Sequence, residues 1–77
     1  MQPIKLDGKL VYGVIVADGA GARLRLSLDE AEQLGLLPGR QVRVEAPGQS
    51  GTFLVAASDD VPPFVFLRLQ SLSWVAG

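Results

Sequence analysis

The sequence predicts a mostly β fold, a small closed β-barrel of about six strands with one short α-helix. Three observations predict it. Alternating apolar and polar runs recur along the chain, turn residues separate them at short intervals, and only one segment has helical periodicity. Six strands with too few helices to cover a sheet favour closure into a barrel, which also removes exposed strand edges.

Length and composition predict one globular domain, residues 1–77. A chain of this length is near the lower size limit at which a hydrophobic core alone stabilises a fold. Hydrophobic residues make up 48% of the chain, which excludes a disordered protein. We expect residues 1–8 to form a polar lead-in to the barrel. The strand at residues 9–17 has apolar residues at both its odd and its even positions, so we expect it to be buried on two faces. We expect a bend at Gly13.

The second strand, residues 22–28, alternates between leucines on one face and Arg23, Arg25 and Ser27 on the other. A hairpin turn at residues 18–21 connects it to the first strand. The remaining strands are expected at residues 40–46, 52–58, 64–69 and 72–75, with turns at residues 47–51 and 59–63.

The short helix follows the second strand directly, with a recognisable signal at each end. Ser27 is the expected N-cap, and Glu30 three residues later completes a capping box. Gly35 suits the left-handed position after the last turn, and Pro38-Gly39 is typical of a type II turn.

Composition removes much of the catalytic repertoire. The chain has no Cys and no His, so it lacks a thiolate nucleophile, the usual general base and the commonest zinc ligands. The net charge is −1 without a run of like charges, and no apolar stretch approaches the ~20 residues of a membrane-spanning helix. We therefore expect a cytoplasmic protein without membrane insertion.

The individual polar residues have structural explanations as well as functional ones. Asp59 and Asp60, with Asp18, offer carboxylates for a hard cation, but a turn before proline explains the first two without an ion. Ser27 has no base beside it, and its capping role accounts for it. We predict no catalytic residue and no metal site, and a self-contained enzyme is the least favoured class.

Aromatic residues gather toward the C-terminal end of the chain. Phe64, Phe66 and Trp74 fit either a stacking platform or partner anchor, or ordinary core residues of a small barrel. We favour the core interpretation.

The middle of the chain carries a resemblance to a known family. Residues 28–36 supply a helix ending in Leu-Gly-Leu, residues 38–45 a Pro-Gly turn and an alternating strand, and residues 65–67 a Val-Phe-Leu strand. This order resembles the C-terminal, cofactor-embracing domain of the molybdopterin oxidoreductases, a double-psi β-barrel of the aspartate-decarboxylase-like group. The resemblance implies a double-psi-like barrel that acts as a non-catalytic binding or interaction module.

Some positions depart from that family. Arg68, Leu69 and Gln70 stand where the family has a proline and a His-Trp pair, and Arg40 replaces the usual Asp after the turn glycine. Arg68 and Gln70 are thus the candidate cofactor-binding positions, and molybdopterin is the only cofactor that the resemblance implies. The large catalytic body of the family has no counterpart here, which implies an isolated or degenerate domain. Its expected partner is another protein, such as a larger enzyme subunit, or a second copy of the chain.

A second family competes with the first. Residues 22–45 are also similar to the swapped-hairpin transition-state regulators of the AbrB type, which are dimers that bind DNA through arginines near the first hairpin. This alternative makes Arg23, Arg25, Arg40 and Arg43 the nucleic-acid contacts. Their simpler interpretation is that they are solvated outward positions paired with nearby acids.

Overall fold

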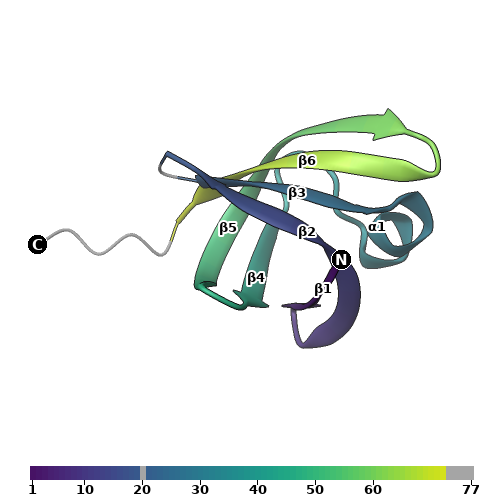
Figure 1. Cartoon of the computed structure of the whole chain (residues 1–77). Helices are drawn as coiled ribbons and strands as arrows, with labels where there is room; N and C mark the ends of the chain where they lie inside the picture. Colours follow the sequence, from purple (N-terminus) through teal and green to yellow (C-terminus); the bar gives the residue numbers. More distant parts are fainter. Residues whose placement is uncertain (20, 73–77) are drawn as a thin grey trace, which may run out of the picture.

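The computed structural model describes residues 1–19 and 21–72. Its elements in chain order are β1 (Gln2–Leu6), β2 (Lys9–Asp18), β3 (Gly21–Ser27), α1 (Leu28–Leu34), β4 (Gln41–Ala46), β5 (Gln49–Val61) and β6 (Phe64–Ser71). The strands form a closed antiparallel barrel in the order β1-β2-β3-β6-β5-β4, which confirms the predicted fold class (Figure 1). The double-psi relationship stays a prediction.

Two three-stranded meanders make up the barrel, β1-β2-β3 and β4-β5-β6, with α1 between them in the sequence. The seams between them are unequal. β3 pairs with β6 along the whole of β3, whereas β1 pairs with β4 only at Lys5 and Leu6. The β3–β6 seam therefore provides most of the pairing between the two meanders.

The long strand β2 turns a corner of the barrel. Its first half pairs with β1 up to Gly13, and its second half pairs with β3 from Val14 onward. Gly13 is buried at this change of partner, where a Cβ atom would lie 2.5 Å from the Arg25 carbonyl oxygen and 2.7 Å from a Leu26 methyl carbon. Only glycine lets the two strands approach this closely.

The long strand β5 changes partner in the same way. It pairs with β4 as far as Leu54 and with β6 from Phe53 to Val61, with an irregularity between Val55 and Ala57. The distal part of β5 therefore leaves the barrel wall together with β6, and the resulting hairpin extends beside α1 (Figure 1).

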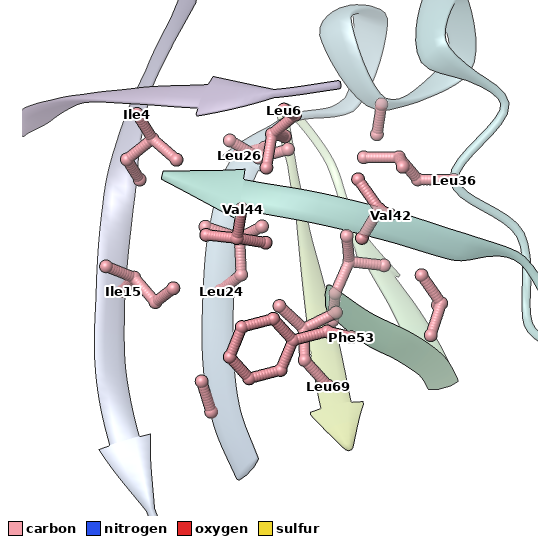
Figure 2. Packing of buried hydrophobic residues seen from close by; sticks show 14 of the residues in the cluster. Ile4, Leu6, Ile15, Leu24, Leu26, Leu36, Val42, Val44, Phe53 and Leu69 are labelled. Carbon is pink, nitrogen blue, oxygen red and sulfur yellow. The ribbon is translucent and has the colours of Figure 1, made fainter. Parts of the chain in front are cut away.

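Aliphatic side chains from all six strands fill the barrel (Figure 2). The alternation predicted for the second strand is confirmed, since Leu24 and Leu26 are fully buried while Arg23 points outward. Phe53 is the one aromatic ring in the described core, and no polar residue among those described is buried. The interior is therefore a packed apolar core.

The helix begins and ends as the sequence predicts. The Ser27 hydroxyl accepts a hydrogen bond of 3.1 Å from the backbone N–H of Glu30, which is the expected N-cap contact. Gly35 is left-handed at the C-cap, with φ of 64°, and donates its N–H to the carbonyls of the last turn. The backbone N–H of Arg40 donates to the Leu37 carbonyl across Pro38-Gly39, in agreement with the predicted turn.

The prediction for the N-terminal segment is wrong. Residues 1–8 are not a lead-in, because Gln2–Leu6 form β1 and the side chains of Ile4 and Leu6 are completely buried. A two-residue turn at Asp7 and Gly8, with φ of 52° and 83°, connects β1 to β2. Asp-Gly between apolar runs is a strong type I′ hairpin signal, and it was available in the sequence.

Other boundaries also differ. β2 is buried on one face only, because Leu10, Tyr12 and Val16 are exposed. β5 continues through the expected breaks at residues 49–51 and 59–61, and Leu72 lies outside any strand. Residues 73–75 of the last predicted strand, Trp74 included, lie outside the described residues. The described residues contain six strands, with β1 added to those that the sequence predicts.

Candidate binding surfaces

The four arginines of the DNA-binding alternative do not form one patch in the chain. Arg23 and Arg25 lie on β3, whereas Arg40 precedes β4 and Arg43 lies on it. Two strands separate β3 from β4 in either direction around the barrel, so the two pairs lie on opposite sides of it.

Arg40 and Arg43 belong to a structural contact at the β1–β4 seam. One Asp7 carboxylate oxygen accepts from the Arg43 backbone N–H at 2.9 Å, and the other accepts from Arg40 Nη2 at 2.7 Å. The Asp7 backbone N–H in turn donates to the Arg43 carbonyl. The Arg43 backbone bond, followed by the Arg40 side-chain bond, lowers the pKa of Asp7 below its ordinary value, against a smaller opposing effect of burial. Asp7 thereby extends a seam that has only two paired residues on each strand.

On the opposite side, residues of β2, β3 and β6 align in rows on the outer surface. Val16 pairs with Arg23 and Arg23 with Arg68, while Val14 pairs with Arg25 and Arg25 with Phe66. Directly paired residues project from the same face of a sheet. We call the surface made by Val14, Val16, Arg23, Arg25, Phe66 and Arg68 the β3–β6 face.

This face is apolar as well as cationic. Val16 is 57% exposed and Phe66 45% exposed, although both are large apolar side chains on regular strands. A hollow of about 450 Å³ lies on one side of Phe66 against Val14 and Val16, and one of about 350 Å³ lies on its other side along Arg68. Arg23 lines both hollows. Exposed apolar side chains beside charged ones are typical of interaction sites.

The arginines of this face are less firmly held than Arg40. Arg23 forms its ion pair with Asp18 at 2.9 Å while both side chains are at least half exposed, so the pair contributes little and exchanges readily. The Arg25 guanidinium lies 4.9 Å from the centre of the Phe64 ring. Among the described residues, its buried Nε has no hydrogen-bond partner.

Sequence reasoning missed the apolar half of the face. Phe64 and Phe66 were expected in the core, but Phe64 is half-buried under Arg25 and Phe66 points outward. The strand that contains Val14 and Val16 was expected to be buried on both faces, but the side chain of Val16 is exposed. The available signal was Arg68, because a strand places Phe64, Phe66 and Arg68 on the same side and the charged residue marks that side as the outer one.

The candidate cofactor residues Arg68 and Gln70 lie on the outer surface of β6, and both are exposed. Arg68 borders a shallow hollow with Arg23 and Phe66, while Gln70 pairs with Gly21 at the far end of the seam. In the described part of the chain these side chains do not enclose a dinucleotide, so we derive no chemistry through a pterin. Their assignment stays a prediction.

The acidic residues do not gather into a cation site. Within residues 1–19 and 21–72, no group of three or more potential ligands is close enough to hold a metal ion. Asp59 pairs with the outward Phe66 and Asp60 with the buried Val65, so the two carboxylates project from opposite faces of β5. Neither carboxylate lies in the expected turn, because β5 extends to Val61.

None of the helices in the described residues has the length and apolar character needed to cross a membrane. Comparison with protein-family models, with curated proteins and with solved structures found no match to this chain.

Proposed function

We propose that the chain is a non-catalytic binding module that holds a protein partner on its β3–β6 face. This deepens the expectation from the molybdopterin-oxidoreductase resemblance, in which the partner is a larger enzyme subunit. The observation that carries the proposal is the exposed Phe66, which stands between two hollows. Three arginines, Arg23, Arg25 and Arg68, and one carboxylate, Asp59, surround it.

The chemistry of the face defines the partner. Phe66 and Val16 supply apolar area, while the arginines supply planar donors that suit carboxylates. Arg25 lies over the Phe64 ring in the described structure and adds a third cationic side chain to this face. A partner segment with apolar residues next to aspartate or glutamate complements this surface in both respects.

The DNA-binding regulator remains the alternative, with a different requirement. It needs Arg40 and Arg43 on the same surface as Arg23 and Arg25, whereas one chain carries the pairs on opposite sides of its barrel. A duplex would then have to be contacted by pairs from two copies. The protein-binding proposal needs only one face of one copy.

The test is a titration of the chain with a dye-labelled acidic amphipathic peptide made of glutamate and leucine, followed by fluorescence anisotropy. We expect saturable binding that weakens about tenfold in Phe66→Ala, because a central aromatic anchor contributes over 1 kcal/mol. The matched control is Leu10→Ala, which removes an apolar side chain with 55% exposure from the first half of β2, away from the β3–β6 face. The control is expected to bind as the unchanged chain does.

A parallel titration uses duplex DNA at two salt concentrations. Failure of the peptide to bind, or equal weakening by both variants, would contradict the proposal. Saturable DNA binding with a steep salt dependence, lost on substitution of Arg40 and Arg43, would favour the regulator instead.

A further inference from the structure

The distal part of β5 has an edge to which no strand of the described residues pairs. β4 pairs with β5 only as far as Leu54, and Val55 still exchanges backbone hydrogen bonds with Gly39 and Arg40. From residue 56 to Val61, β6 is the only described strand that pairs with β5. In an antiparallel strand alternate residues direct their N–H and C=O groups to each side, so this edge can accept another strand.

A hollow of about 310 Å³ lies beside this edge, between the β5–β6 hairpin and α1. Its apolar surface comes from the side chains of Leu28, Ala31, Leu36 and Val65. Its polar groups are Ser58 and Asp60 from β5 and Glu32 from α1. Ser58 and Asp60 pair with the buried Leu67 and Val65, so their side chains project from the inner side of the hairpin.

We propose that this edge binds an extended basic peptide segment by strand addition, with a lysine or arginine side chain inserted in the hollow. The inserted side chain lays its aliphatic stem along Leu28, Ala31 and Leu36, and its charged end meets Glu32 and Asp60. The peptide backbone pairs with the open edge of residues 56–61.

Charge favours a basic occupant over an acidic or neutral one. The hollow contains two carboxylates and no lysine or arginine among its lining residues. The first turn of α1 adds Asp29 and Glu30, and its last turn contains no basic residue. An acidic segment would place like charges together at this edge, which costs binding free energy.

This surface and the β3–β6 face lie on opposite sides of the hairpin, and Ser58 borders a hollow on each side. Asp59 is the residue between Ser58 and Asp60, and it projects outward toward Phe66, on the other side of the hairpin. Asp59→Asn therefore removes the same charge from the same strand without changing the hollow. It is a matched control for Asp60→Asn.

The experiment titrates the full chain with a dye-labelled, end-blocked peptide of alternating lysine and valine, followed by fluorescence anisotropy. We expect Asp60→Asn and Glu32→Gln each to weaken binding about threefold to tenfold, through loss of a charge-assisted contact. Asp59→Asn is expected to leave the affinity unchanged. A peptide with N-methyl groups along one edge is expected to bind at least about tenfold more weakly, because it cannot form the ladder.

Amide hydrogen exchange locates the peptide on the chain. Bound peptide is expected to slow exchange at alternate residues between 56 and 61. The proposal is overturned if the lysine peptide does not bind, if a glutamate–valine peptide binds equally well, or if Asp59→Asn and Asp60→Asn weaken binding equally. Protection confined to β3 and the outer side of β6 would also overturn it, while leaving the proposed function intact.

Discussion

Two pairs of arginines lie on or directly beside strands of the barrel, and they have different surroundings. Arg40 is bound to Asp7 at 2.7 Å with only 35% of its side chain exposed, whereas Arg23 is 66% exposed in its pair with Asp18. Arg43 donates its backbone N–H to Asp7, and Arg25 lies over Phe64 with an unsatisfied Nε. The Arg40 side chain and the Arg43 backbone thus serve a barrel seam on one side, whereas Arg23 and Arg25 lie on an open surface on the other.

The difference follows from the strength of the two seams. β1 and β4 share few paired residues, so a side chain that bonds to both the backbone and an arginine is needed there. β3 and β6 pair along seven residues of each strand and need no such support. The arginines of β3 are therefore available for another use.

The largest expected effect is on stability, from a substitution in the contact between β2 and β3, the strand that carries Arg23 and Arg25. Gly13→Ala places a Cβ 2.5 Å from the Arg25 carbonyl oxygen, so β2 and β3 must separate. We expect the free energy of unfolding to fall by about 2–3 kcal/mol in urea denaturation followed by circular dichroism.

Gly48→Ala is the control for Gly13→Ala, because it meets nothing within 4 Å and changes only a residue with φ of 80°. It is expected to cost about 1 kcal/mol. Equal losses in the two variants would show that β2 and β3 do not approach as closely as described.

The second prediction compares the two aspartates directly. Asp7→Ala removes an acceptor from a backbone N–H and places alanine at a φ of 52°, so we expect a loss of about 1–2 kcal/mol in the free energy of unfolding. Asp18→Ala breaks only an exposed ion pair and should cost less than about 0.5 kcal/mol. The same denaturation assay measures both losses. A larger loss for Asp18→Ala would show that the Asp18–Arg23 pair, and not the Asp7–Arg40 pair, stabilises the barrel.

The smallest effect is the pH dependence at Asp7. Asparagine tolerates the left-handed backbone, so Asp7→Asn removes mainly the charge and should cost only about 0.5 kcal/mol near neutral pH, since the ion pair is partly exposed. Because the folded pKa of Asp7 is lowered, its contribution is complete above the ordinary pKa of about 3.9 and disappears as the pH falls through the folded value. Urea midpoints of the two proteins should therefore converge as the pH falls below about 4. A difference that persists unchanged at the acid end would exclude the carboxylate charge as its source.

The sequence predicted the barrel and its helix well because local rules determine them. Ser27 and Gly35 are cap residues in both prediction and structure, and the alternation of β3 places its leucines inward. The first strand was missed because its only buried residues, Ile4 and Leu6, stand among polar residues and a proline. The Asp7-Gly8 pair was nevertheless a signal for a hairpin.

The candidate surfaces depend on contacts that composition does not specify. Strand order decides that Arg23 lies beside Arg68 and far from Arg43, and order is set by pairing between distant segments. Periodicity alone did not distinguish a strand buried on two faces from β2, whose outer residues Leu10, Tyr12 and Val16 are exposed. The edge of β5 to which no described strand pairs likewise follows from where β4 ends.

The most direct test of the account compares two double variants, Arg23→Gln/Arg25→Gln and Arg40→Gln/Arg43→Gln, in the titration with the acidic amphipathic peptide. We expect about tenfold weaker binding for the β3 variant and unchanged binding for the Arg40/Arg43 variant, with both proteins folded by circular dichroism. Equal weakening by the two variants would contradict the division of the arginines into a seam pair and a binding pair.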